Sequence, residues 1–184
     1  MTRIVSRRPA NEEVSADYHQ KLIDLVDGEC VMKVLNDQLY WLCELASSIS
    51  IEQLEKIHSP YQWTIRQVFD HCACAERVFG YRMMRFAAGD STELPGWDEN
   101  AYADARFGLG NFTHLVTELG DLRKSNLMLL RRINPATWDH CGVADDATLS
   151  TRAVAWVAAG HLQHHFDIVE QRCQVSVPRS ADHA

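Results

Sequence analysis

Two histidines near the end of the chain have the residue type and spacing needed to bind a metal ion. His161 and His165 lie four residues apart in the segment GHLQHHFDIVEQR. On an α-helix, residues four apart differ by only about 40° in direction and lie one turn apart, so both imidazoles project from the same side. The neighbours that continue this side are all apolar: Val154, Val157, Ala158 and Ile168. Core-facing imidazole nitrogens need partners, and a divalent transition metal provides one.

A third histidine strengthens the metal hypothesis. His71 lies between Val68 and Ala75 on the apolar side of a second predicted helix. Three inward imidazoles from two helices would leave coordination positions free for water or substrate, as in a catalytic site. The alternative is that the histidines are half-buried and bonded to carboxylates of neighbouring helices.

The other candidate ligands fit the pattern less well. His164 is about 60° from His161 on a helical wheel, in a less uniformly apolar row, so we expect it beside the site or in solvent. Cys72 and Cys74 diverge by about 160° on a helix and cannot both face one metal ion. We predict that Cys72 is a small core residue.

Further chemistry could come from the residues that follow His71. Glu76, Tyr81 and Arg82 are candidate catalytic residues, and Arg82 could hold a substrate carboxylate. An ion pair between Arg82 and Glu76 is an equally good interpretation. Asp98, Glu99, Asn100 and Tyr102 could line a pocket mouth, but a solvated acidic loop is the favoured interpretation.

These residues must be positioned by long helices. Apolar residues at helical spacing predict helices over about 30–47, 64–89, 111–133 and 150–173. Thr64 is a plausible N-cap and Gly89 a plausible C-terminal glycine of the second helix. No segment reads convincingly as a strand. We therefore predict an all-α, four-helix bundle of the up-down-up-down type, with a long loop between helices two and three.

The totals restrict the function. The chain has 184 residues, which fits one domain, and we expect a flexible tail over 1–14, the bundle over 15–175 and a second tail over 176–184. A net charge of -7 disfavours nucleic-acid and anionic-membrane partners. The opening MTRIVSRRPA lacks the apolar stretch of a signal peptide, so we expect a cytoplasmic protein whose six cysteines are reduced.

Three segments resemble a known family. WTIRQVFDHCACAERVFGYRMMRFAAGD, LPGWDENAY and TRAVAWVAAGHLQHHFDIVEQR occur in the order expected for the DinB-like superfamily. These are DinB/YfiT-like four-helix metalloproteins related to bacillithiol and mycothiol transferases. The resemblance pairs Trp63 with His71, implies metal ligands at His71, His161 and His165, and implies zinc or nickel and a homodimer. CGVADDATLS looks like a diverged form of the family's Gly/Asn-rich turn.

Two classes of function follow. The first is a metal-dependent enzyme acting on a small molecule, either by transferring a low-molecular-weight thiol to an electrophile or by hydrolysis. The second is a non-catalytic protein, either metal-stabilised and stress-associated or a dimerisation module.

Overall fold

Four long helices form the body of the protein. The computed structural model describes residues 5–105 and 110–179. The long helices are α2 (Val31–Ser48), α4 (Ile65–Ala87), α6 (Phe112–Arg132) and α7 (Thr151–Cys173). Shorter elements are η1 (Asn11–Glu13), α1 (Asp17–Asp24), α3 (Ile51–Glu55), α5 (Glu99–Ala105), η2 (Pro135–Asp139), β1 (Cys141–Ala144) and β2 (Ala147–Ser150). The predicted helical bundle is confirmed.

The helix ends follow from local hydrogen bonding. Thr64 caps α4 by accepting from the backbone N–H of Gln67, whose side chain accepts in return from the backbone of Thr64. Ser150 caps α7 in the same way through the N–H of Ala153. Gly89 follows α4 with a φ of +73°, the left-handed conformation that glycine adopts without cost.

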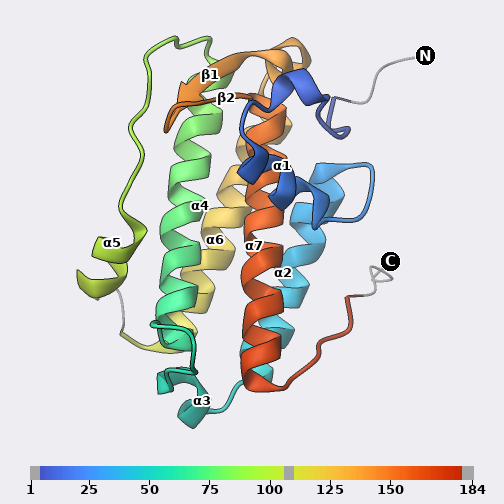
Figure 1. Cartoon of the computed structure of the whole chain (residues 1–184). Coiled ribbons are helices and arrows are strands. Elements are labelled where there is room, and N and C mark those ends of the chain that lie inside the picture. Colours follow the sequence, from blue (N-terminus) through green and yellow to red (C-terminus); the bar gives the residue numbers. More distant parts are fainter. Residues whose placement is uncertain (1–4, 106–109, 180–184) are drawn as a thin grey trace.

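The helix directions differ from the predicted up-down-up-down order. Glu76 contacts Arg123, and about one turn further along both helices the backbone of Gly80 lies against Asn126, so α4 and α6 run parallel. α2 and α7 run in the opposite direction (Figure 1). Residues 88–105, here called the crossing segment, carry the chain back along the bundle before α6 begins, which permits this arrangement.

A hairpin precedes α7, where the sequence predicted no strand. β1 and β2 pair antiparallel, with Ala144 opposite Ala147. The two residues between them, Asp145 and Asp146, have φ of 55° and 58°. Positive φ at both central residues is the geometry of a tight hairpin turn, and aspartate tolerates it better than most residues. The hairpin also holds the crossing segment, since Leu94 exchanges backbone hydrogen bonds with Val143 and Asp145.

The interior has two apolar clusters with a polar network at its centre. One cluster includes Phe86 and Trp156, and the other includes Leu42 and Phe166. Arg123 of α6 is 1% exposed and donates two hydrogen bonds to Glu76 and one to the Ala158 carbonyl. It also contacts Gln38 of α2, so one guanidinium joins all four long helices.

α1 lies against α7 because residue 160 is a glycine. A Cβ atom at Gly160 would lie 2.0 Å from the backbone oxygen of Leu22. No other residue type permits this approach without moving one of the helices. The contact fixes α1, and with it Tyr18 and His19, beside the middle of α7.

The described parts of both predicted tails contact the bundle. We expected a flexible tail over residues 1–14, but Arg8 lies over the Trp156 ring at 4.7 Å and the Glu13 carboxylate pairs with buried Arg152. At the other end Val177 is buried and Arg179 pairs with Asp167 and Glu170. These charge and stacking contacts anchor segments whose composition alone indicates tails. Residues 1–4 and 180–184 of the predicted tails lie outside the described residues.

The helices in the described part of the chain do not meet the requirements of a membrane-spanning helix. None of them combines the length and apolar character needed to cross a bilayer.

The central network generates a stability prediction. Replacing Glu76 with Gln leaves the buried Arg123 guanidinium without its counter-charge, so the free energy of unfolding should fall by about 3–5 kcal/mol. Urea denaturation followed by circular dichroism measures the change. Glu118→Gln is the matched control, because Glu118 pairs with Arg77 across the same two helices but both side chains are nearly half exposed. That variant should change stability by about 1 kcal/mol or less. Equal effects of the two substitutions would contradict the role of Arg123.

Candidate metal centre

The rings of His71, His161 and His165 converge in the interior. His71 projects from α4, while His161 and His165 project from successive turns of antiparallel α7. Nε2 of His161 lies 2.9 Å from Nε2 of His71 and 3.2 Å from Nε2 of His165. One candidate ligand atom from each ring lies within 4.8 Å of the others. The structure therefore brings together the three residues that the spacing selected.

All three rings are held neutral. Burial, reinforced by nearby His164, lowers the pKa of His71 to about 4. Burial also lowers the pKa of His161 and of His165 well below the ordinary histidine value, and the neighbouring rings add to this effect. A neutral imidazole keeps a lone pair on one nitrogen, which is the form that binds a metal ion.

The protein alone does not satisfy these nitrogens. Each neutral ring has one N–H, so three Nε2 atoms that meet can share a proton only pairwise and leave a lone pair facing another. Within the described chain, buried Nδ1 atoms of His71 and His165 have no hydrogen-bond partner. Nitrogens bound to one tetrahedral ion at about 2.0–2.1 Å lie about 3.3 Å apart, close to the spacing here. The group is suitable for a metal ion.

Aromatic side chains surround the cluster. The Trp97 ring stacks on His71 with centroids 5.4 Å apart and planes 10° apart. Trp63, eight residues before His71 in the sequence, also contacts its ring at 5.1 Å. Phe79 meets His161 edge-on at 5.4 Å. These walls keep water away from the rings on several sides and fix their orientation.

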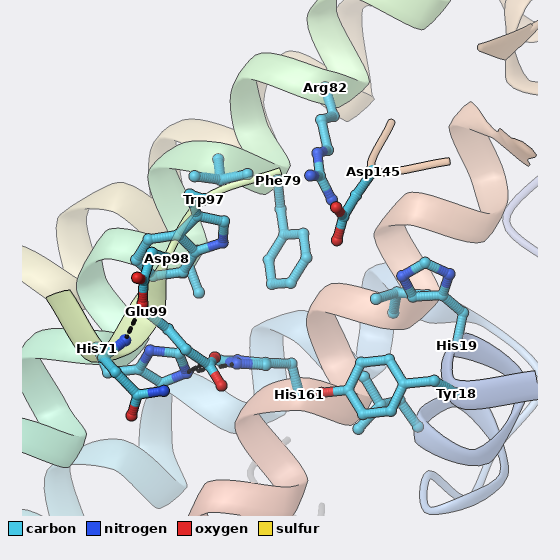
Figure 2. A pocket seen from close by; sticks show the side chains of 15 residues that line it. Tyr18, His19, His71, Phe79, Arg82, Trp97, Asp98, Glu99, Asp145 and His161 are labelled. Carbon is cyan, nitrogen blue, oxygen red and sulfur yellow. Dashed lines mark hydrogen bonds and ion pairs between the residues drawn. The ribbon is translucent and has the colours of Figure 1, made fainter. Parts of the chain in front are cut away.

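One side of the cluster opens into a cavity of about 390 Å³ (Figure 2). His71 and His161 lie at one end of it. Arg82 of α4, Asp145 of the hairpin turn and His19 of α1 lie towards the other end. The volume fits a small organic molecule. His165 faces a second, smaller cavity of about 280 Å³ that Trp63 and Arg172 line.

Glu99 is a site residue that the sequence argument placed in a solvated loop. Its Oε2 lies 3.7 Å from Nε2 of His71, and its side chain is 55% exposed. Together with Asn100 it lines both cavities. The signal that could have found it is its place two residues after Trp97, since an aromatic residue in a polar segment indicates a contact with the body of the protein.

The segment that carries Glu99 is fixed at both ends. Asp98 caps α5 by accepting from the backbone N–H groups of Asn100 and Ala101. Gln67 of α4 donates to the carbonyl of Ala103, which is buried. With Leu94 paired to the hairpin, Trp97 and Glu99 are held over the histidines.

The other sequence candidates occupy different places. Glu76 is buried and bonded to Arg123, so the ion pair considered between Glu76 and Arg82 is absent from the described residues. Tyr81 is 48% exposed, contacts Arg85 and does not line the cavity of the histidines. Arg82 does line that cavity. The geometry therefore retains only Arg82 of these three near the cluster.

The remaining histidine and cysteines lie outside the cluster. His164 is exposed, with its ring 5.2 Å from that of His165. Cys72 and Cys74 are both buried. Burial raises the pKa of each thiol, so neither is a thiolate at neutral pH. Cys72 packs in the apolar cluster with Phe69 and Leu162, as predicted for a core residue.

Comparison with known proteins places the fold. A family model described as the DinB superfamily matches residues 41–169. Among solved structures, the chain is similar to YfiT from Bacillus subtilis, described as a probable metal-dependent hydrolase with an unusual four-helix bundle topology. The identity is 18% and the TM-score 0.65, over 94% of this chain and 99% of that one. No curated protein matches the chain.

The neutral histidines generate a prediction about acid stability. The unfolded chain takes up protons near the ordinary histidine pKa of about 6.5, whereas folded His71 stays neutral until about pH 4. The folded state of metal-free protein is therefore favoured above pH 6.5, and that advantage is lost as pH falls from about 6.5 to about 4. Each such ring contributes up to about 1.4 kcal/mol per pH unit.

Urea denaturation of chelator-treated protein across this pH range tests the prediction. His71→Phe should show a shallower dependence than the parent chain, and substitution of exposed His114 by Asn should not. The same slope in all three proteins would show that His71 is not held neutral.

Proposed function

This chain belongs to the DinB superfamily, and from that premise we propose that it is a metal-dependent hydrolase of a small molecule. The observation that carries the proposal is the convergence of three neutral histidines at the end of a cavity, with the Glu99 carboxylate beside them. The likeness to YfiT, itself described as a probable metal-dependent hydrolase, supports the same reaction class.

His71, His161 and His165 would hold one divalent transition metal ion through their Nε2 atoms, with zinc or nickel expected. Such an ion, when bound, polarises a substrate carbonyl and lowers the pKa of water. Three protein ligands fit a catalytic rather than a structural site, because structural sites close the fourth position with another side chain. The free side of the cluster faces the cavity where a substrate would lie.

Glu99 acts as the general base in this proposal. Its Oε2 would take the proton of the attacking water and return it to the leaving group. Its side chain is half exposed, so solvent can reach the carboxylate, while the turn of α5 holds it next to His71. Trp63 and Trp97 pack against the His71 ring and exclude bulk water from the sides of it that they cover.

Transfer of a low-molecular-weight thiol uses the same kind of centre and was the other reaction expected from the sequence. Hydrolysis is favoured because a carboxylate base has a clear role with water, which holds its proton far more tightly than a thiol does. The alternative is a metal ion that only stabilises helix packing, and this alternative does not explain why the Glu99 carboxylate lies beside the histidines. A homodimer and a cytoplasmic location stay predictions.

Metal binding is the first prediction of this proposal. Protein purified without a histidine tag and loaded with zinc should retain about one equivalent after desalting, measured by plasma emission spectrometry. His161→Ala should lose it, because Nε2 of His161 lies within 3.2 Å of Nε2 of both other histidines. His114→Ala is the control, since His114 is exposed on α6. Undiminished zinc in His161→Ala would remove this residue from the site.

The role of Glu99 is a separate prediction. Zinc-loaded protein should hydrolyse members of a panel of small amides and esters, and chelation should abolish the activity. Glu99→Gln should lower kcat by about 100-fold or more while zinc content stays unchanged, because only the proton acceptor is lost. Glu93→Gln, an exposed carboxylate on the same crossing segment, should retain activity. Turnover unaffected by Glu99→Gln would exclude the general-base role, and zinc binding without any turnover would favour the structural role.

A further inference from the structure

A buried arginine faces the cavity without a protein partner. Arg82 is 6% exposed and lines the wall of the 390 Å³ cavity away from the histidines. Within residues 5–105 and 110–179, its guanidinium makes no hydrogen bond and no ion pair at contact distance. Burial lowers the pKa of the guanidinium, and the nearby charge of Asp145 opposes that change. A buried guanidinium with free donors is costly unless a ligand satisfies it.

A second donor faces the same end of the cavity. His19 of α1 lines the cavity, and its buried Nδ1 has no hydrogen-bond partner among the described residues. Figure 2 shows His19 and Arg82 on two sides of Asp145, across the cavity from His71 and His161. Three elements therefore place groups here: α4, α1 and the hairpin turn.

We propose that Arg82, assisted by His19, binds a carboxylate of the substrate, so that the substrate is a small monocarboxylate whose hydrolysable bond lies at its other end. The inference rests on the proposed function, because it takes the histidine cluster as the reacting end. The planar guanidinium matches a carboxylate with two parallel hydrogen bonds. His19 lines the same cavity and can offer a ring N–H as a further donor.

The charge of the cavity restricts the substrate to a single carboxylate. Asp98, Glu99 and Asp145 all line the same cavity. These acidic groups oppose a second negative charge anywhere except against Arg82 or at the metal. A phosphate ester or polyphosphate would bring its charges close to them. Asp145 lies near Arg82 without an ion pair at contact distance, and its charge opposes the lowering of the guanidinium pKa by burial.

The spacing along α4 separates the two ends. His71 and Arg82 are eleven residues apart, which is three turns, so they lie on the same side of the helix about 16 Å apart along its axis. The substrate therefore has its carboxylate several bonds away from the reacting group.

Hydroxamates test this arrangement, because the hydroxamate group binds metal ions and the other end can be varied. The probes are the monohydroxamates of succinic, adipic and suberic acids, each compared with the analogue whose free carboxyl is a carboxamide. Binding to zinc-loaded and to metal-free protein is measured by calorimetry. In the parent chain, at least one acid should bind about 10-fold or more tightly than its amide.

Substitutions of Arg82 test whether this residue causes the preference for the acid over the amide. Arg82→Gln should reduce the ratio of amide to acid dissociation constants to about one while leaving the affinity for the amide unchanged. Arg82→Lys should keep part of the preference, since it keeps the charge without the planar pair of donors. Arg85→Gln is the control, because Arg85 lies on the same helix outside the cavity and should leave the ratio unchanged.

The outcomes separate the inference from the proposed function. Equal binding of acid and amide at every chain length in the parent protein overturns the carboxylate site and leaves the metal centre standing. An unchanged ratio in both Arg82 variants overturns it too. Zinc-independent binding, or no binding of any probe, overturns the metal centre and the inference with it. The comparison of acid with amide in the parent chain decides the matter even where Arg82→Gln does not fold.

Discussion

The antiparallel contact between α4 and α7 is the constraint on which the rest of the structure depends. It brings an imidazole of one helix against two imidazoles of the other, at the border between the two apolar clusters of the interior. Burying neutral rings at such a position costs free energy, since their nitrogens face one another and have lost their hydrogen bonds to water. The surrounding aromatic walls and the central Arg123 network give the bundle the rigidity to keep them there.

The crossing segment, residues 88–105, covers the histidine cluster on one side of the bundle. Because α6 runs parallel to α4, the chain must travel back along the bundle, and on the way it places Trp97 and Glu99 against His71. An up-down-up-down bundle would join these helices by a short loop and would leave the cluster open. The direction of α6 therefore explains why a crossing segment is present, and this segment contributes Trp97 and Glu99 to the cavity.

Much of the fold and of the site could be predicted from the sequence because the signals are local. Helical periodicity selected His71, His161 and His165, and the caps at Thr64 and Gly89 gave the limits of α4. Family resemblance from three segments was confirmed by the matching family model. What could not be predicted depends on distant contacts: the direction of α6, the hairpin, and the partner of a buried charge. Glu76 has the same local pattern whether it meets Arg82 or Arg123, and only packing decides.

Gly160 and His161 are adjacent in the sequence but are required for different reasons, one for helix packing and one for the histidine cluster. The glycine permits the backbone of Leu22 to touch α7, whereas the histidine belongs to the three-histidine group that could hold a metal ion. A relative that has abandoned the chemistry while keeping the fold should thus retain the glycine and vary freely at the histidines. In this Gly-His pair, the glycine therefore indicates the packing of α1 on α7, and the histidine indicates the candidate metal site. Comparing the two positions separately in other family members could distinguish proteins that keep the histidine site from proteins that keep only the fold.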